Sequence, residues 1–331
     1  AARLLAPLRD CRAYFSGPKQ DVLPQSLPLA WEWVEDRLVI TGAAKELPDV
    51  HVGDTVVALD GRSAAERVAE EEALLSATTA ESRRLTVVED LLFGPPGSAV
   101  TLRLQRAGSA TFDVSVARVP WSQDLPAGTP YAAVDEIRPG ILYVDLSRAA
   151  DDALQTLMPR MAAARGLIFD LRRGSNMPTE LLSYLTDRTF MGPQMQTPSV
   201  TAPDHRGWQW MTTAVAHDPR TPRLKARAAF LTDGRADIFT ETLLAMIEAY
   251  GLGDIVGART GGCNGMINRA DLPGGYRLSW SGRRMVKRDG TNLHGTGVAP
   301  TVPAARTFQG IAAGRDEIVE RAVEVLDSAA R

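Results

Sequence analysis

The chain has 331 residues, of which 44% are hydrophobic and 23% are charged, a composition typical of globular proteins that bury a sizeable core. A formal charge of -3 and a pI near 5.9 exclude the basic surface that attracts nucleic acid or an anionic membrane. No apolar run approaches the roughly 20 residues of a membrane span, so we expect neither nucleic acid nor a membrane as a partner.

The first 28 residues mix a short helical pattern with a proline-broken stretch and predict a cap or linker. Residues 29–119 read mostly as short β-strands, rich in branched and aromatic residues and separated by glycine turns. From 120 to 331 strands alternate with helices, which is typical of βαβ units in a parallel sheet. The sequence therefore predicts an α/β protein whose larger, second domain follows a smaller β domain.

The opening residues AARLLAPLRD lack the layout of a signal peptide, so we expect a cytoplasmic chain, although a removed leader stays open. Two cysteines, Cys11 and Cys263, could form one disulfide, but they make neither a disulfide framework nor a zinc site. The four histidines are scattered. The pattern therefore implies no metal and no cofactor, and it leaves the oligomeric state open.

Several motifs resemble a known family when taken in order. The stretch VHVGDTVVALDGRSAAE at 50–66 resembles the core of a PDZ domain. The segments ILYVDL, GLIFDLR, FLTDG with TETLLAMIEAYG and DIVGARTGG, and HGTGVAPTV resemble the carboxyl-terminal-processing (tail-specific) serine peptidases. The resemblance covers about residues 29–304. It implies a ClpP/crotonase-like α/β core preceded by a PDZ-like β domain.

The resemblance extends to the framework of the family's active site but not to its chemistry. Asp233 and Gly234 match the turn, and Glu241 matches the glutamate of the helix that follows. The family's nucleophilic serine falls on Ile238, and its general-base lysine falls on Cys263. An isoleucine has no nucleophilic atom, so the resemblance implies a diverged member without the Ser/Lys dyad.

Two further family positions have changed. The oxyanion loop DLRGNPGG corresponds to DLRRGSNMPTE from residue 170, and Thr301 stands for an aspartate in the closing motif. Among the four lysines only Lys287 lies near these segments, either as a displaced base or as a solvated turn residue. We therefore expect no peptide hydrolysis by the family mechanism.

Three residues are candidates for proton transfer or nucleophilic attack, and each has a structural alternative. Asp237, at the helix start, is either a general base in a desolvated cleft or a helix cap. Cys263 is either a reactive thiolate or a small buried hydrophobe. His294, in NLHGTG, either partners these groups or caps a glycine turn.

Other residues are candidates for ligand binding. The backbone N–H of Phe239, at the helix start, could donate to an oxyanion. Ser175 and Asn176 follow a strand at its carboxyl end, where open α/β sheets bind ligands. Arg235 replaces a motif glycine and would either hold a carboxylate or enolate or be solvated. The full set of expected ligand contacts is Gly234, Arg235, Ile238, Phe239, Ser175 and Asn176.

Three functions follow from these residues. The first is non-proteolytic chemistry of the cyclase, lyase or isomerase type on a small or peptide-like acyl compound. The second is a pseudopeptidase that binds peptides or acts as a scaffold, and the third is a residual hydrolase that uses Cys263. An enclosed cavity reaching Asp237 or Cys263 would favour an enzyme, and an open PDZ groove beside a plugged cleft would favour a binding protein.

Overall fold

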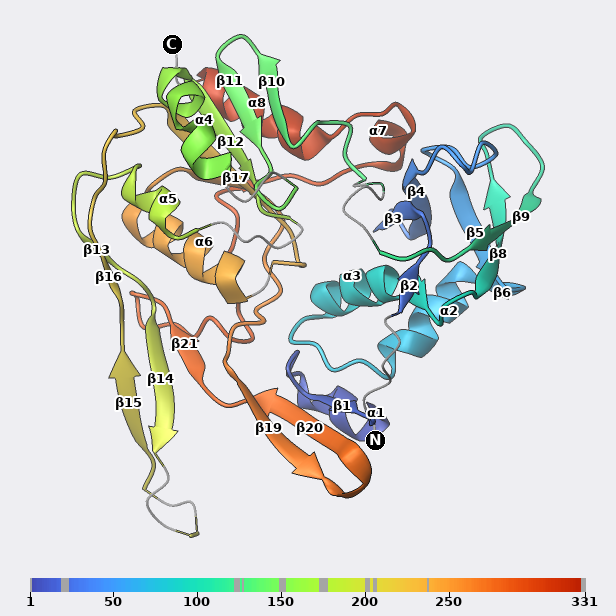
Figure 1. Ribbon diagram of the computed structural model, residues 1–331, viewed down its shortest axis with the longest axis horizontal. Coiled ribbons are helices and arrows are strands. Elements are labelled where there is room, and N and C mark those ends of the chain that lie inside the picture. The colour runs from blue at the N-terminus through green and yellow to red at the C-terminus, as the bar shows by residue number, and fades with distance from the viewer. Residues whose placement is uncertain are drawn as a thin grey trace.

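The chain folds around two larger β-sheets, each with its own hydrophobic core (Figure 1). The computed structural model describes residues 2–18, 24–121, 126, 128–148, 153–172, 178–199, 203–204, 207–236 and 238–328. Of the helices in these ranges, none combines the length and the apolar character that crossing a lipid bilayer demands.

The first sheet is antiparallel at every pair of neighbouring strands. In β8 (Ala99–Gln105) buried and exposed side chains alternate along the whole strand, as expected for a sheet with one face in the core. The sheet order is β3 (Leu29–Val34), β4 (Arg37–Ala43), β5 (Thr55–Leu59), β8 and β9 (Phe112–Ala117), with β6 (Arg62–Ser63) paired to β5.

Two helices cover this sheet, and the sequence specifies where each begins. Ser63 and Glu66 form a reciprocal capping box at the start of α2 (Ala64–Glu72), and the Thr79 side chain caps α3 (Ala80–Asp90). The indole N–H of Trp31, on β3, donates to the Val88 carbonyl of α3 at 2.7 Å. Helix α3 is thereby fixed to the edge strand β3.

The second sheet confirms the α/β class that the alternation of strands and helices predicts. Its order is β10 (Val134–Arg138), β11 (Ile141–Val144), β12 (Gly166–Asp170), β17 (Arg227–Thr232), β18 (Asp254–Gly257) and β22 (Val302–Pro303). All strands are parallel except the edge strand β10. One face packs against α4 (Ala153–Ala163), α5 (Glu180–Ser183) and α6 (Ile238–Tyr250), and the other against α8 (Glu317–Ser328).

Smaller elements surround the two sheets. The N-terminal segment, expected as a cap or linker, forms α1 (Ala2–Leu5), the 3-10 helix η1 (Ala6–Leu8) and a strand β1 (Tyr14–Ser16). Strand β1 pairs with β20 (Tyr276–Ser281), which also pairs with β19 (Ile267–Leu272), so the N-terminal segment lies in one sheet with strands about 260 residues further along the sequence (Figure 1). A protruding arm contains β14 (Gln194–Ser199), β15 (Gln209–Thr213) and β21 (Arg284–Val286). The remaining short elements are β2 (Gln25–Ser26), β7 (Phe93–Gly94), β13 (Phe190–Met191), β16 (Ala216–His217), η2 (Pro273–Gly275) and α7 (Phe308–Ala312).

Buried ion pairs fill the carboxyl end of the second sheet. Arg172, just after β12, donates from Nε to Asp170 at 2.9 Å and from Nη2 to Asp316 at 2.9 Å, and all three side chains are buried. The Tyr143 hydroxyl also donates to Asp170, at 2.7 Å. Burial alone would raise the pKa of the Asp170 carboxyl, but the Arg172 charge and these hydrogen bonds outweigh it and lower the pKa to about 2.

We expect Arg172→Leu to lower the free energy of unfolding at pH 7 by about 3–5 kcal/mol, because it leaves two carboxylates buried without a cation. The matched control is Arg321→Leu, which removes an exposed pair with Glu324 and should cost less than about 1 kcal/mol. Urea unfolding of both variants measures the difference. Equal losses of unfolding free energy in the two variants would show that the buried Arg172 cluster stabilises the fold no more than an exposed ion pair does.

Because of the same cluster, we expect the free energy of unfolding to depend on pH in the acid range. The pKa of Asp170 in the folded protein lies below its ordinary value of 3.8. The contribution of ionised Asp170 to the free energy of unfolding is therefore complete above pH 3.8 and is lost as the pH falls towards 2. The shift corresponds to about 2 kcal/mol. Urea unfolding at pH 5, 4, 3 and 2 should show a smaller acid loss in Arg172→Leu than in the unsubstituted chain. If the free energy of unfolding fell with pH by the same amount in both proteins, Arg172 would not be the cause of the lowered pKa of Asp170.

Candidate functional site

The turn before α6 lies directly against helix α3. A Cβ added to Gly234 would stand 3.0 Å from a methyl of Leu85 on α3, and one added to Gly261 would stand 2.7 Å from the Gly234 carbonyl oxygen. The Thr78 hydroxyl, just before α3, donates to the Gly261 carbonyl at 2.6 Å. Glycine is therefore required at Gly261, where a Cβ would meet the backbone of the turn, whereas a Cβ at Gly234 would only press on the flexible Leu85 methyl.

Glu241 fixes that loop against α6. Its side chain is completely buried, and its Oε1 accepts from the Thr260 hydroxyl at 2.6 Å and from the Gly262 N–H at 2.5 Å. The Thr260 oxygen in turn accepts from the Val298 N–H at 2.8 Å, which connects the closing loop to the same carboxylate. The residue that matches the family's glutamate thus holds the frame of the site together.

The first turn of α6 carries no nucleophile at Ile238. The Ile238 carbonyl accepts from Asn264 Nδ2 at 3.1 Å, and the same amide donates to the Thr242 hydroxyl at 3.2 Å. Asn264 is completely buried, yet its Oδ1 has no hydrogen-bond partner. The sequence reasoning missed Asn264, although its position beside Cys263 in a glycine-rich loop could have indicated it. Phe239, the next residue of α6, is 73% exposed.

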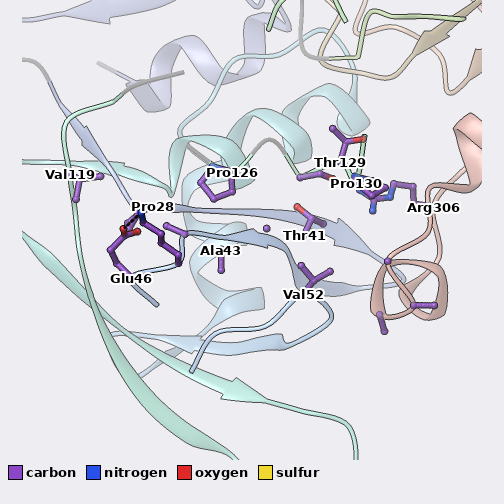
Figure 2. Close-up of a pocket in the computed structure, with 17 residues that line it drawn as sticks. Pro28, Thr41, Ala43, Glu46, Val52, Val119, Pro126, Thr129, Pro130 and Arg306 are labelled. Carbon is purple, nitrogen blue, oxygen red and sulfur yellow. Dashed lines mark hydrogen bonds and ion pairs between the residues drawn. The ribbon is translucent and has the colours of Figure 1, made fainter. Parts of the chain in front are cut away.

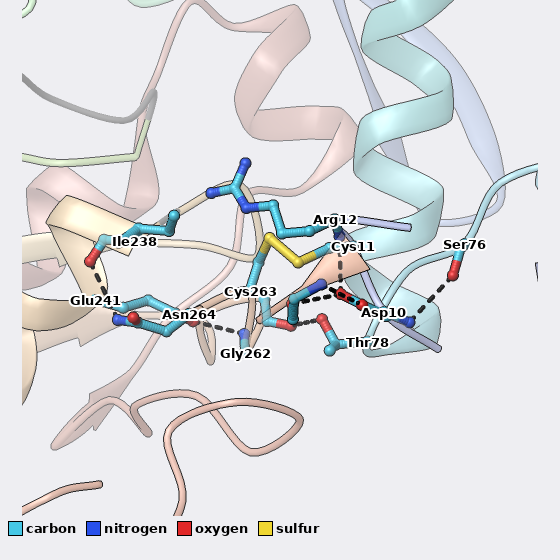
Figure 3. The surroundings of a disulfide bond; sticks show 12 residues. Asp10, Cys11, Arg12, Ser76, Thr78, Ile238, Glu241, Gly262, Cys263 and Asn264 are labelled. Atoms are coloured by element: carbon cyan, nitrogen blue, oxygen red, sulfur yellow. Dashed lines mark hydrogen bonds between the residues drawn. A yellow bond between two sulfur atoms is a disulfide. The ribbon is translucent and has the colours of Figure 1, made fainter. Parts of the chain in front are cut away.

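Cys263 forms a disulfide with Cys11 across 252 residues of sequence (Figure 3). Their Cα atoms lie 5.7 Å apart. The hypothesis that Cys263 is a free thiolate is therefore wrong, because a disulfide sulfur carries no proton to exchange and no charge to attack with. The residual hydrolase built on Cys263 is excluded for the same reason.

Polar contacts also fix the N-terminal segment beside the disulfide. The Asp10 carboxylate accepts from the Ser281 N–H at 2.8 Å and from the Ser281 hydroxyl at 2.6 Å. The Asp10 N–H donates to Ser76, in the turn before α3, at 3.0 Å. Residues 10–13 are therefore attached to the first sheet's helices, to β20 and to the loop at 259–265.

Arg235 is neither solvated nor unpaired. Its Nε donates to Asp233 at 2.9 Å, and its side chain lines a small cavity of about 80 Å³ between β3 and α3. Burial alone would lower the pKa of this guanidinium, but the charge of Asp233, with help from Glu32 and Glu89, raises it instead. The cation expected to hold a ligand is therefore occupied by a carboxylate of its own turn.

His294 is partly buried, and its Nδ1 has no hydrogen-bond partner. The next residue, Gly295, donates from its N–H to the Gly262 carbonyl at 2.9 Å, so the histidine's loop lies against the loop that contains Cys263. Three expected site residues, Asp237, Ser175 and Asn176, lie outside the described residues. The structure thus brings the loop of His294 to the loop of Cys263 and leaves the roles of Asp237, Ser175 and Asn176 as predictions.

Two other positions have structural partners. Lys287 donates to Glu248, on α6, at 2.8 Å, and is largely buried, so it is not a solvated turn lysine. Thr301 accepts from the Ile255 N–H at 2.9 Å and donates back to the Ile255 carbonyl at 3.2 Å. The Lys287 contact attaches its turn to α6, and the Thr301 contacts attach the closing segment to β18 of the second sheet.

A cavity of about 1110 Å³ lies between the first sheet and the chain that connects to the second (Figure 2). Its walls are the end of β4, residues 126 and 128–130, and the end of α7, and most of its lining side chains are small and apolar. Arg306 lines one end, with 6% of its side chain exposed, and donates to Glu32 at 3.1 Å and to the Gly128 carbonyl at 2.9 Å.

We expect Cys11→Ser and Cys263→Ser each to lower the free energy of unfolding by about 2–5 kcal/mol, because each removes the same covalent link. The double variant should lose about as much as either single variant, since the two positions act as one unit. Urea unfolding without reductant measures all three. Additive losses, or labelling of a native thiol before reduction, would contradict the disulfide.

The sequence profile of peptidase family S41 matches residues 140–304. No curated protein sequence matches the chain significantly.

Among solved structures, mature CPAF complexed with lactacystin aligns with a TM-score of 0.70 at 15% identity, over 99% of this chain and 86% of CPAF. The photosystem II D1 C-terminal processing protease aligns with a TM-score of 0.52 at 18% identity, over 98% and 84% of the two chains. A putative S41 protease from Bacteroides fragilis aligns with a TM-score of 0.52 at 13% identity, over 96% and 86%. The chain therefore belongs to peptidase family S41, the tail-specific protease family that its motifs resemble.

Proposed function

We propose that this S41 family member has lost the Ser/Lys dyad and binds a peptide-like ligand without hydrolysing it. One observation carries the proposal: the two dyad positions hold Ile238 and the disulfide-bonded Cys263. A Ser/Lys mechanism needs a hydroxyl and a neutral amine within hydrogen-bond reach. Neither position supplies one, and the nearest lysine, Lys287, is paired with Glu248.

The framework that survives supports binding rather than catalysis. Glu241 uses its carboxylate to hold the loop at 259–265, and Arg235 is paired with Asp233. The Glu241 carboxylate and the Arg235 guanidinium are thus engaged in contacts that hold the turn and the loop together. A scaffold can retain such contacts after its chemistry has been lost.

The cavity of Figure 2 is the place where we propose that a peptide-like ligand binds. Its volume of about 1110 Å³ suits a ligand larger than a single side chain. The pairing of β4 with the following segment ends at Ile40, whose N–H donates to the Asp54 carbonyl and whose carbonyl accepts from the Gly53 N–H. Among the described residues, the last residues of β4 therefore pair with β3 alone, which leaves one edge free. An extended peptide could add to that free edge, as in other strand-addition complexes.

The first sheet with its two helices supports a PDZ-like assignment for residues 29–119 within the same proposal, and a ClpP/crotonase-like assignment for residues 120–331. The groove between β3 and α3 holds only about 80 Å³, and Arg235 of the second domain lines it. That space is more than ten times smaller than the cavity beside β4. The wider cavity beside β4 therefore fits a ligand better than the narrow groove.

A second candidate function rests on His294. Its buried Nδ1 has no partner beside the loop that carries Asn264, whose Oδ1 is also without one. Such a pair could serve non-proteolytic acid–base chemistry of the cyclase, lyase or isomerase type on an acyl compound, with Asp237 as a further proton carrier. This alternative differs from the first because it requires turnover that depends on His294.

The disulfide also changes the expected compartment. A link between Cys11 and Cys263 persists where the surroundings are oxidising, and it is rare in a reducing cytoplasm. We therefore propose an oxidising compartment in place of the cytoplasm. Free thiols at both positions in protein isolated under alkylating conditions would reverse this proposal.

We expect no cleavage of an unfolded protein or of tagged peptides, because the dyad positions offer neither a nucleophile nor a base. Mass spectrometry of the incubated substrates provides the measurement, with a dyad-bearing family member as the positive control. Cleavage that persists in the purified chain and disappears in His294→Gln would overturn the binding proposal. Such a result would also contradict the second candidate function, which is non-proteolytic.

We expect Val52→Trp to weaken peptide binding by about tenfold or more, because Val52 lines the cavity and an indole there fills its mouth. The control is Val215→Trp, an equal change at a residue that is 65% exposed on the arm side of the molecule. Fluorescence polarisation with a pool of labelled peptides compares the two. Equal affinities would place the ligand elsewhere.

A further inference from the structure

The cavity of Figure 2 has a polar end, which consists of Thr41 on β4, Thr129 and Arg306. Most of the other lining side chains are alanine, glycine, proline or valine. Among the residues that the structure describes, the Thr41 and Thr129 hydroxyls and Arg306 Nε are buried and have no hydrogen-bond partner. Thr41 is only 7% exposed. Buried polar atoms without partners are rare and destabilising, so three of them at one end of a cavity indicate a ligand that supplies the partners.

Contacts between three segments of the chain bring the polar end together. A Cβ added to Gly42, the neighbour of Thr41, would stand 3.5 Å from the backbone N of Gly128. Gly128 immediately precedes Thr129, and its carbonyl accepts from Arg306 Nη1 at 2.9 Å. The three side chains therefore belong to one region of the cavity, as Figure 2 shows.

The charge of Arg306 is already balanced within the protein. Its Nη1 also donates to the Glu32 carboxylate at 3.1 Å, and its Nη2 donates to the Arg315 carbonyl at 3.3 Å. A ligand carboxylate at this end would lose its water and would lie close to the charge of Glu32, and both effects disfavour it. The polar end therefore favours a neutral polar group over an anion.

The hydrogen-bonding capacity of the three atoms narrows the choice of neutral group. An arginine Nε can only donate, whereas a threonine hydroxyl can donate and accept. A matching group must therefore contain an acceptor for Arg306 and can contain donors for the two hydroxyls. A carboxamide has one carbonyl oxygen and two N–H donors, so a single carboxamide has a partner for each of the three atoms. A backbone carbonyl brings only the acceptor, and an aliphatic side chain brings neither.

We propose that the polar end binds the carboxamide of a glutamine or asparagine side chain, carried by the peptide that adds to the free edge of β4. Its oxygen would accept from Arg306 Nε, and its N–H groups would donate to the Thr41 and Thr129 hydroxyls. This inference rests on the proposed function, because it names the side chain that the cavity selects. Main-chain contacts with β4 supply affinity, and the polar end supplies specificity.

The first experiment needs no ligand and measures melting temperatures by differential scanning fluorimetry. Thr41→Val removes a buried hydroxyl that has no partner, so the melting temperature should be unchanged or higher. The control is Thr260→Val, which removes a hydroxyl that contacts Glu241 and Val298 and should therefore lower the melting temperature. A lower melting temperature in Thr41→Val would show that this hydroxyl already has a structural partner and would overturn the proposal.

The second experiment compares fluorescein-labelled heptapeptides, Thr-Ala-Val-Xaa-Val-Ala-Thr, by fluorescence polarisation. The guest residue Xaa is glutamine, asparagine, glutamate or methionine, and each carboxyl terminus is amidated so that no terminal carboxylate takes part. We expect the better of the two carboxamide peptides to bind about tenfold more tightly than the methionine peptide, which fills a similar volume without hydrogen bonds. The glutamate peptide should bind no better than the methionine peptide. Equal binding of the carboxamide and methionine peptides, or tighter binding of glutamate, would overturn the proposal.

The third experiment assigns this selectivity to the polar end. Thr41→Val should weaken binding of the carboxamide peptide by about fivefold or more and leave the methionine peptide unchanged. The control Thr101→Val, at an exposed threonine of the same sheet, should change neither affinity. Val52→Trp, which fills the mouth of the cavity, should weaken both peptides.

The outcomes separate this inference from the proposed function. If Val52→Trp weakens both peptides but Thr41→Val keeps the full preference for the carboxamide, the inference is wrong and the proposed function stands. If none of the heptapeptides binds the unsubstituted chain, or if Val52→Trp changes neither affinity, the cavity is not a peptide site. The proposed function is then rejected, and the inference is rejected with it.

Discussion

The completely buried carboxylate of Glu241 accepts hydrogen bonds from Thr260 and from the Gly262 N–H, and the rest of the site follows from this contact. A carboxylate can be buried only when donors replace the water that it loses. The loop at 259–265 must therefore bring its donors to α6, which places Cys263 and Asn264 beside the helix start. The disulfide then brings the N-terminal segment to the same place. This dependence explains why the glutamate matches the family while the dyad positions do not.

Charged groups around the second sheet fall into two kinds. Arg172 and Arg235 are paired with aspartates of their own or neighbouring segments, and they close the carboxyl end of the sheet. Arg12 has no such partner in the described residues. A buried cation that is paired with carboxylates contributes to the fold.

The sequence was sufficient to predict the α/β class and the frame of the site, because both depend on local patterns. Periodicity places the strands, and the spacing from Asp233 to Glu241 defines the turn and the helix. Other features depend on contacts between distant residues and could not be predicted. Nothing local relates Cys11 to Cys263, and nothing local shows that Arg235 turns back to Asp233. The pairing of β1 with β20 is unpredictable for the same reason.

The central claim is that the start of α6 retains a binding frame but no nucleophile. Intact-protein mass spectrometry after incubation with a fluorophosphonate, which phosphonylates activated hydroxyl groups, tests it most directly. The account predicts no added mass on this chain under conditions that fully label a dyad-bearing relative. A stoichiometric adduct on a hydroxyl next to Ile238, such as that of Thr240, would contradict it and would show that a displaced nucleophile remains active.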